Sequence, residues 1–149
     1  MGEKILIVDD IDLNREILAV ALGDIYPVIE AGNGNQAIAA LKEHSDDIAA
    51  ILLDLIMPEL DGYAVLKYMK QAGMMDSIPV LVISAESKTE VERECLELGV
   101  SDFIRKPFDS VTVRSRVKNV VDLFMYKNQL EEKVQMQTEN LQRQNKLLE

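Results

Sequence analysis

The feature that most constrains the fold is a regular alternation of short apolar runs with segments of helical spacing. The apolar runs occupy residues 4–8, 26–31, 48–53, 79–83 and 101–104. Helical patterns fill residues 12–23, 33–44, 62–73, 87–99 and the segment after residue 108. Strands that alternate with helices of about ten residues are typical of βαβ units on a parallel sheet. The sequence therefore predicts an α/β fold with a five-stranded parallel sheet.

The strand sequences also predict the order of the strands. Residues 5–8, 48–53 and 80–83 are continuously apolar, as expected for strands that are covered on both faces. The second run contains Pro27, which cannot donate to a ladder and favours an edge, and the short polar fifth run also suits an edge. With right-handed crossovers, the order becomes 2-1-3-4-5, which describes a doubly wound, flavodoxin-like (βα)5 fold.

Apolar residues at three-to-four spacing predict one buried face on each helix. These faces include Leu13, Ile17 and Val20 on the first helix, and Val91, Cys95 and Leu98 on the fourth. Glycine follows three of the helices, where a left-handed C-cap favours this residue. These glycines are Gly23, Gly73 and Gly99.

Composition limits the function and the compartment. The formal net charge is −10, which argues against direct binding of nucleic acid. A single cysteine, Cys95, excludes an internal disulfide. No apolar run is long enough to cross a bilayer, and the N-terminus lacks the layout of a signal peptide. We therefore expect a cytoplasmic protein without a membrane partner.

The predicted strand order brings three carboxylates to one small region. Ligands of a doubly wound sheet bind at the carboxyl ends of the strands, at the switch point between strands one and three. Asp9, Asp10 and Asp54 stand at those two ends. Carboxylate oxygens suit Mg²⁺, and Ser84 and Lys106 lie in loops that open on the same face. A metal, an ammonium and a hydroxyl around a free carboxylate form a phosphoryl-transfer site, in which aspartate can be the covalent acceptor.

Four segments of the chain resemble the signature segments of response-regulator receiver domains. They are ILIVDD at 5–10, LDLIMPELDG at 53–62, VISA at 82–85 and FIRKPF at 103–108. The resemblance runs from about residue 4 to residue 124, with every segment in order and on the expected element. It implies a receiver domain in residues 1–124 that takes part in a two-component phosphorelay.

The resemblance also implies a role for each acidic residue. Asp54 would be the nucleophile that takes a phosphoryl group from a phosphohistidine of a sensor histidine kinase or a phosphotransfer protein. Mg²⁺, or Mn²⁺ in its place, would be held by Asp10, by the Asp54 carboxylate and by the backbone carbonyl of Ile56. Asp9 would act through metal-bound water. Because only its own aspartate is modified, the domain is not expected to turn over an external substrate as an enzyme does.

Three further residues have implied roles in binding and switching. Lys106 would pair with the phosphoryl oxygens, and the Ser84 hydroxyl would donate a hydrogen bond to one of them. Phe103 occupies the switch aromatic position, which turns inward when Ser84 is drawn to the phosphoryl group. The Lys106–Pro107 peptide bond would be cis.

Other interpretations remain open from the sequence. Taken singly, Asp10 or Asp12 could cap the first helix, and Asp54 could begin a solvated loop. A haloacid-dehalogenase-like phosphatase would need a second acid where Ile56 stands. A flavodoxin-like mononucleotide binder would need a Ser/Thr/Gly-rich loop where Asp9 and Asp10 stand. A degenerate receiver that serves only as a coiled-coil dimerisation scaffold is the remaining alternative, although the acids and the lysine are all present.

The segment after residue 124 predicts a helical extension of the domain. Residues 125–149 are rich in Gln, Glu, Lys and Leu and contain neither Gly nor Pro. A three-four repeat, interrupted by Lys127, Gln137 and Gln144, occupies positions 120, 123, 127, 130, 134, 137, 141, 144 and 148. We expect the last helix to continue through residues 125–149 and to form a parallel homodimer through residues 120–148. A solvated linker helix is the alternative. Because the pattern stops abruptly, we also expect a covalently linked output domain.

Overall fold

The computed structural model describes residues 2–57, 60–85 and 89–148, with side chains as far as residue 144. Strands and helices alternate along the whole described chain, as predicted. The strands are β1 (Lys4–Val8), β2 (Val28–Ala31), β3 (Ile48–Asp54), β4 (Val80–Ser84) and β5 (Asp102–Arg105). The helices are α1 (Asp12–Leu22), α2 (Gly34–His44), α3 (Gly62–Gln71), α4 (Thr89–Glu97) and α5 (Ser110–Leu148). The predicted start of the fourth helix, at Ser87, lies outside the described residues.

The five strands form one parallel sheet in the order β2-β1-β3-β4-β5. This order confirms the predicted 2-1-3-4-5 arrangement and places β2 and β5 at the edges. Pro27 immediately precedes β2, and its carbonyl accepts a hydrogen bond of 2.9 Å from the Ile5 amide of β1. The proline therefore joins the ladder only as an acceptor, just before the first residue of an edge strand, where a missing N–H is tolerated.

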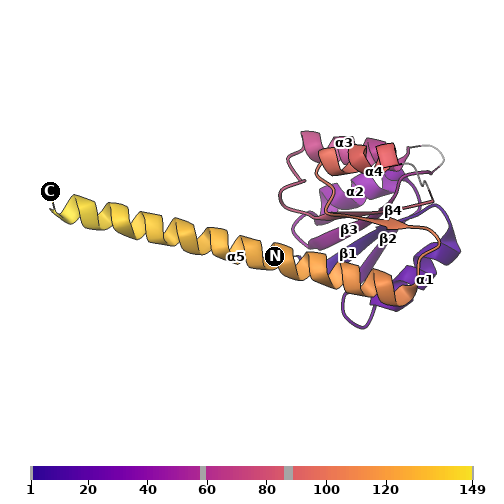
Figure 1. Ribbon diagram of the computed structural model, residues 1–149, viewed down its shortest axis with the longest axis horizontal. Coiled ribbons are helices and arrows are strands. Elements are labelled where there is room, and N and C mark those ends of the chain that lie inside the picture. The colour runs from indigo at the N-terminus through magenta and orange to yellow at the C-terminus, as the bar shows by residue number, and fades with distance from the viewer. Residues whose placement is uncertain (1, 58–59, 86–88, 149) are drawn as a thin grey trace.

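Helices cover both faces of the sheet. Helices α2, α3 and α4 lie on one face, and α1 and α5 lie on the other (Figure 1). Along β1, Leu6 and Val8 are buried with the first group, and Ile5 and Ile7 are buried with the second. A strand whose alternate residues enter two different cores must be apolar at every position, which explains the continuous apolar runs.

The predicted buried face of α1 is wrong. Leu13, Ile17 and Val20 are 61%, 38% and 78% exposed, whereas Leu18 and Leu22 are buried against the sheet and α5. Both rows satisfy the helical spacing because this helix is apolar on more than one side. The direction in which the sheet and α5 lie decides which row is buried, and spacing alone does not contain that information. The prediction for α4 is confirmed, since its row is buried or packs against the core.

Two of the three predicted glycine caps are confirmed. Gly73 and Gly99 have φ angles of 73° and 100°, in the left-handed region that favours glycine. Gly23 has a φ of −65° and a right-handed conformation, so the prediction for this residue is wrong. The chain continues to turn in the right-handed sense after α1, and the Tyr26 amide donates to the Leu22 carbonyl at 2.9 Å.

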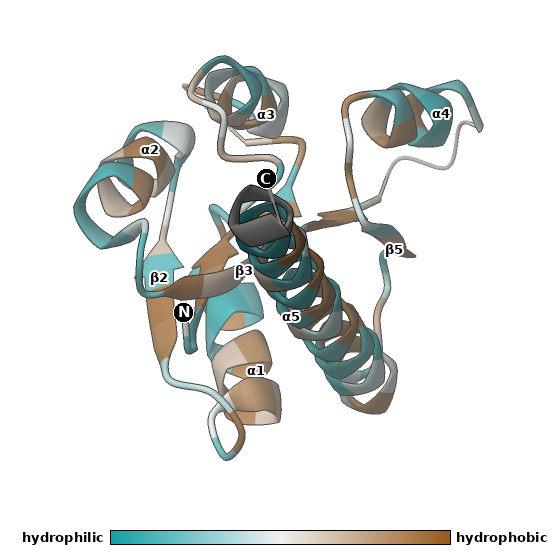
Figure 2. Cartoon of the chain, turned by 90° about the vertical axis from the view of Figure 1, so that its left-hand side faces the viewer, coloured by the Kyte–Doolittle hydropathy of each residue, from teal (hydrophilic) through white to brown (hydrophobic). Residues whose placement is uncertain are grey.

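Helix α5 begins as part of the domain and then leaves it. Val113, Val117 and Val121 are buried against the sheet, and beyond residue 128 every side chain that the structure describes is exposed. The helix has 39 residues and runs without a break, as predicted. Its length of about 58 Å, at about 1.5 Å per residue, makes it project far beyond the sheet (Figure 1). Figure 2 looks toward the free end of this helix.

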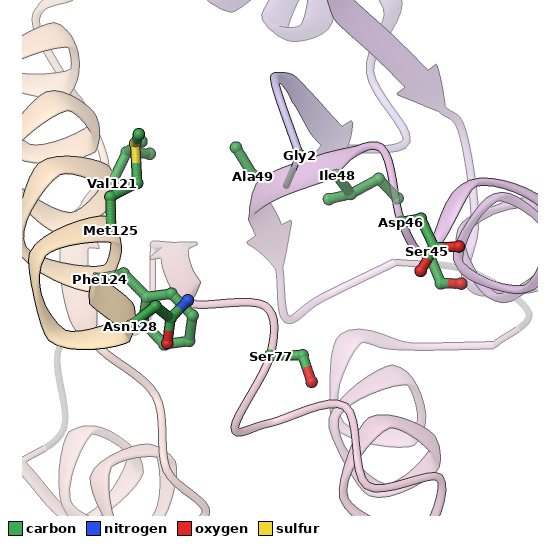
Figure 3. A pocket seen from close by; sticks show the side chains of 10 residues that line it. All are labelled: Gly2, Ser45, Asp46, Ile48, Ala49, Ser77, Val121, Phe124, Met125 and Asn128. Atoms are coloured by element: carbon green, nitrogen blue, oxygen red, sulfur yellow. The ribbon is translucent and has the colours of Figure 1, made fainter. Parts of the chain in front are cut away.

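A cavity of about 250 Å³ marks the place where α5 leaves the sheet (Figure 3). Phe124 and Asn128 of α5 line one side, and Ile48 at the start of β3 lines another. Because Asp54 ends the same strand six residues later, this cavity lies about 20 Å from the predicted acidic site, at the opposite end of the sheet.

Among the described helices, none combines the length and the apolar composition that a membrane span would require.

Candidate functional site

Asp9 and Asp54 lie side by side at the carboxyl ends of β1 and β3. The parallel register pairs Val8 with Leu53, so the next residues of the two strands meet at the edge of the sheet. Asp9 and Asp54 are almost completely buried, at 2% and 4% exposed, whereas Asp10 is partly exposed. One carboxylate oxygen from each of the three acids lies within 4.8 Å of the others. The acids that the sequence predicted to converge are thus brought together.

The two buried acids are held by the same kind of local turn. The Ile11 amide donates to Asp9 Oδ1 at 2.9 Å, and the Ile56 amide donates to Asp54 Oδ1 at 3.2 Å. In both cases an aspartate side chain accepts from the amide two residues later, which is the Asx turn that aspartate favours at the end of a strand. One oxygen of each carboxylate is therefore fixed by its own backbone, and the other oxygen is left for long-range contacts.

Lys106 makes those long-range contacts. Its Nζ lies 3.2 Å from Asp9 Oδ2 and 3.2 Å from Asp54 Oδ2. The Lys106 amide donates to the Ser84 carbonyl at 2.9 Å, which continues the pairing of β4 with β5 and carries the lysine to the acids. The Lys106–Pro107 peptide bond is cis, as predicted. A single ammonium, directly after β5, thus bridges the two buried carboxylates at the ends of β1 and β3.

The buried environment shifts the protonation equilibria of the central pair. Burial raises the pKa of the Asp54 carboxyl above its ordinary value, although Lys106 and the Ile56 amide oppose this shift. Burial alone would lower the pKa of Lys106, but the charges of Asp54 and Asp9 raise it above its ordinary value. The lysine therefore stays charged, and the aspartate is a buried carboxylate whose charge is only partly compensated.

The remaining predicted residues lie around this group. Ser84 ends β4, is completely buried, and follows Ile83, the register partner of Asp54. The Ile56 side chain is 58% exposed, so only its backbone faces the acids. Phe103 is 9% exposed and lies inward, in the hydrophobic cluster under α2, α3 and α4.

The structural alternative for the acids is not supported. The N-cap of α1 is Ile11, and no side chain caps this helix end. Neither Asp10 nor Asp12 therefore serves as a cap. Asp12 instead pairs with Arg15 at the surface.

Two residues near the acids were missed by sequence reasoning. The Asn14 side chain donates to Asp9 Oδ2 at 3.3 Å, and Arg15 Nη1 donates to the Asp9 carbonyl at 2.6 Å. Both lie on the first turns of α1. The sequence did contain one signal for Arg15, which stands three residues after Asp12. At this spacing on a helix, the arginine side chain leans back toward the helix N-terminus, where the acids lie.

The donor set fits a hard divalent cation. Two buried carboxylates and a partly exposed one face a single ammonium, so the group carries excess negative charge that a cation would neutralise. Oxygen ligands that leave room for water are typical of Mg²⁺ sites. Such a site can bind an anionic group, neutralise its charge and present a carboxylate to it.

Comparison with known proteins gives a consistent result. The family model of the response regulator receiver domain matches residues 5–118. Response regulator PleD of Caulobacter vibrioides is 37% identical over 121 residues, which cover 80% of this chain and 26% of PleD. The phosphate regulon transcriptional regulatory protein PhoB of Pseudomonas aeruginosa is 34% identical, over 81% of this chain and 52% of PhoB. The chain thus spans about a quarter to a half of the length of these curated relatives.

Solved structures agree with this comparison. The CheX–CheY–BeF3–Mg²⁺ complex from Borrelia burgdorferi contains a chain that is 31% identical, with a TM-score of 0.73, over 78% of this chain and 87% of that chain. A structure described as adenylate cyclase from Rhodopirellula baltica has a TM-score of 0.79 at 22% identity, over 91% of this chain and 98% of that chain. The second likeness concerns the fold alone.

Proposed function

The chain belongs to the family of response regulator receiver domains, and from this membership we propose that Asp54 accepts a phosphoryl group in a Mg²⁺-dependent reaction. The donor would be a phosphohistidine of a sensor histidine kinase or a phosphotransfer protein. The observation that carries the proposal is the environment of Asp54. This buried carboxylate has Lys106 Nζ at 3.2 Å and the acid pair Asp9 and Asp10 beside it.

The chemistry follows from these positions. Asp54 attacks the phosphorus, the bond between phosphorus and the histidine nitrogen breaks, and an aspartyl phosphate forms. Lys106 neutralises the charge of the phosphoryl oxygens. To reach them, its ammonium gives up one of its two carboxylate contacts, with Asp9 or with Asp54. Asp10, the Asp54 carboxylate and the Ile56 carbonyl would hold Mg²⁺, or Mn²⁺ in its place, with Asp9 reached through water. The bound metal supplies neutralisation of the charge on the transferring group.

The phosphoryl group would be sensed by Ser84 and Phe103. Ser84 is buried one register step beyond Asp54, where its hydroxyl could donate to a phosphoryl oxygen. Phe103 lies on β5, the next strand, with its side chain inward. Movement of Ser84 toward the phosphoryl group would open space beside β4. The ring of Phe103, which already points inward, would fill this space, and its inward position would be stabilised.

The exposed row of α1 supports a protein partner as the phosphoryl donor. Ile17 lines an apolar groove of about 460 Å³ that continues to Lys106 and Phe108. Leu13 and Val20 extend the exposed apolar surface along the same helix. A helical partner that covers this row would bring its phosphohistidine to the edge of the acidic site, and burial of the row would contribute to binding.

The free part of α5 supports a parallel homodimer. Leu130, Val134 and Leu141 of the predicted seam are 44%, 60% and 61% exposed. Val120, the first predicted seam position, is partly buried against its own domain, so the free seam begins at Leu123. The side chain of the last position, Leu148, lies outside the described residues. An isolated helix of this length gains little stability in water from propensity alone, so a second copy is the occupant that the seam favours.

The strength of this pairing can be approximated from the exposed seam. Full burial of a Leu or Val side chain contributes about 1.5–3 kcal/mol. Four seam residues on each helix are on average a little over half exposed, and burying them in a dimer would contribute a favourable free energy on the order of 10 kcal/mol. These residues are Leu123, Leu130, Val134 and Leu141. Association costs about 4–15 kcal/mol, so the net affinity is modest. A coiled coil with polar Lys127, Gln137 and Gln144 in its seam would be weak enough for a signal from the receiver to shift it.

The output of the signal would come from a linked domain. The curated relatives are two to four times as long as the matched segment, and PhoB is named a transcriptional regulatory protein. We place such a domain after α5, with the receiver itself turning over no external substrate and binding neither nucleic acid nor membrane. The free, buried thiol of Cys95 suits a reducing compartment such as the cytoplasm.

Acetyl phosphate tests the proposed function directly. The wild-type chain should take up one phosphoryl group when Mg²⁺ is present and none when it is chelated. Asp54→Asn should take up none, whereas Asp76→Asn, a change at an exposed residue outside the site, should behave as wild type. Equal uptake by wild type and Asp54→Asn would refute the assignment. An unphosphorylated wild type would leave only the alternative of a degenerate dimerisation scaffold.

A further inference from the structure

Arg15 contacts the backbone of the acid pair Asp9 and Asp10, and neither the family resemblance nor the proposed reaction provides a role for it. Its side chain is only 16% exposed. Nη1 donates to the Asp9 carbonyl at 2.6 Å, Nη2 pairs with the Asp12 carboxylate, and Nε lies 3.4 Å from Glu30 Oε1. One guanidinium thus joins the end of β1, the start of α1 and the end of β2.

The bond to the Asp9 carbonyl is the important one of the three. The Asp9 amide still belongs to the sheet, where it donates to the Ala31 carbonyl at 3.1 Å. The Asp9 carbonyl is the point at which the chain leaves the sheet and carries Asp10 toward the site. A charged donor on a partly buried carbonyl forms a strong, directional hydrogen bond. Arg15 therefore makes a direct, charged hydrogen bond to the peptide that joins Asp9 to Asp10.

The other two contacts explain why the guanidinium stays in place but contribute little by themselves. Asp12 is 92% exposed and Glu30 is 48% exposed, and ion pairs of such groups contribute little to stability. They hold a planar fork in one orientation, which a lysine ammonium cannot reproduce. Gly32 leaves room for this fork, since a Cβ at that position would lie 3.3 Å from Arg15 Nη1.

Electrostatics alone would make Arg15 unfavourable at this place. A fixed positive charge beside a cation site weakens cation binding through Coulomb repulsion. The guanidinium must therefore act through geometry if it favours the metal at all. Removal of Arg15 should tighten Mg²⁺ binding if the residue acts through its charge and weaken it if the residue acts through geometry. A measurement of Mg²⁺ affinity therefore separates the two explanations.

We propose that Arg15 is a positioning residue of the phosphoryl-transfer site, which orients the Asp9–Asp10 backbone so that Asp10 meets the divalent cation. The inference rests on the proposed function, because that function gives the site its role in phosphoryl transfer. The quantity that it predicts, however, is the affinity of the site for Mg²⁺. Asn14 supports the same arrangement by donating to Asp9 Oδ2 at 3.3 Å. Residues that orient metal ligands typically change metal affinity by about 10–100-fold when they are replaced.

The test is calorimetric titration of Mg²⁺ into the metal-free chain. Arg15→Met and Arg15→Lys should each raise the Mg²⁺ dissociation constant roughly tenfold, because both lose the forked hydrogen bond. Arg114→Met is the matched control. Arg114 also donates to a backbone carbonyl, that of Ala21, and pairs with Asp24, but at the other end of α1. This variant should bind Mg²⁺ as wild type does.

Acetyl phosphate provides a second readout that a general loss of stability would not reproduce. The Mg²⁺ concentration for half-maximal phosphorylation should rise in both Arg15 variants, and the final extent at saturating Mg²⁺ should match that of wild type. Wild-type or tighter Mg²⁺ affinity in either Arg15 variant would overturn the inference, since charge alone would then account for the residue. If Arg15→Met does not fold, Arg15→Lys decides the question. A wild type that binds Mg²⁺ but takes no phosphoryl group would refute the proposed function and leave this comparison valid.

Discussion

Replacement of Gly62 by alanine should damage the site through the backbone of Asp54. Gly62 is the first residue of α3, and its amide donates to the Leu55 carbonyl at 3.0 Å. A Cβ at this position would lie 2.3 Å from the Asp54 carbonyl oxygen and 2.7 Å from Leu55 Cα. Both atoms belong to the backbone, so neither can rotate away. The start of α3 and the end of β3 must separate by about 1 Å to restore ordinary contact.

The magnitude follows from this forced separation. Overpacking of a tight contact costs about 1–3 kcal/mol of the free energy of unfolding. A displacement of about 1 Å at a reacting group can reduce its rate by about a hundredfold. We therefore expect Gly62→Ala to lose roughly 1–2 kcal/mol of stability and one to two orders of magnitude in the rate of phosphorylation. Urea unfolding and the rate of uptake from acetyl phosphate in saturating Mg²⁺ measure the two quantities.

Gly73→Ala is the matched control, at the other end of the same helix. Gly73 has a φ of 73°, and a Cβ there would meet no atom within 4 Å. An alanine in this left-handed conformation costs about 1–2 kcal/mol through its own backbone strain. The two variants should therefore lose similar stability, and only Gly62→Ala should lose rate. A wild-type rate in Gly62→Ala, or an equal loss of rate in both variants, would refute the reasoning.

Three further predictions concern charge, pH and assembly. Asp10→Ala should raise the thermal unfolding midpoint of the metal-free chain, because it removes one of three crowded carboxylates; a lower midpoint would contradict the crowding. Hydrogen bonds from the Thr112 side chain and amide lower the pKa of Asp109, so its contribution to stability is present above its unfolded pKa and lost as pH falls through the folded one. Asp109→Asn should therefore flatten the loss of stability between about pH 5 and pH 2 in urea unfolding, and an unchanged slope would argue against a role for these hydrogen bonds. Truncation after Met125 should convert a dimer to a monomer in sedimentation at tens of micromolar, whereas identical monomers before and after truncation would make α5 a linker.

Strand order and the convergence of the acids were predictable because few residues determine them. The continuous apolar runs indicate that β1, β3 and β4 are interior strands, and the short polar fifth run indicates an edge. Pro27 favours an edge for its strand but does not determine it, since Pro79 stands in the same position before the interior strand β4. Once the order is known, the switch point is known as well, and the residues after the first and third strands must meet there. The positions of Asp9 and Asp54 therefore followed from topology alone.

The details that escaped prediction depend on directions that a sequence does not contain. Helix α1 carries two apolar rows, and only the position of the sheet and α5 identifies Leu18 and Leu22 as the buried one. Gly23 follows a helix as Gly73 does, but the path to β2 turns in the other sense. The spacing of Arg15 indicates that its side chain leans toward the start of α1, but its partner there is a backbone carbonyl, which residue types do not identify.

The central claim is that Asp54 is the phosphoryl acceptor, and its most direct test is to locate the phosphoryl group by mass spectrometry. The chain would be treated with acetyl phosphate and Mg²⁺ and digested, and every aspartate-containing peptide would be compared with an untreated sample. The account predicts one modified peptide, with the added phosphoryl group on Asp54 and none on Asp9 or Asp10. A phosphoryl group on any other residue, or none in the wild-type chain, would contradict it.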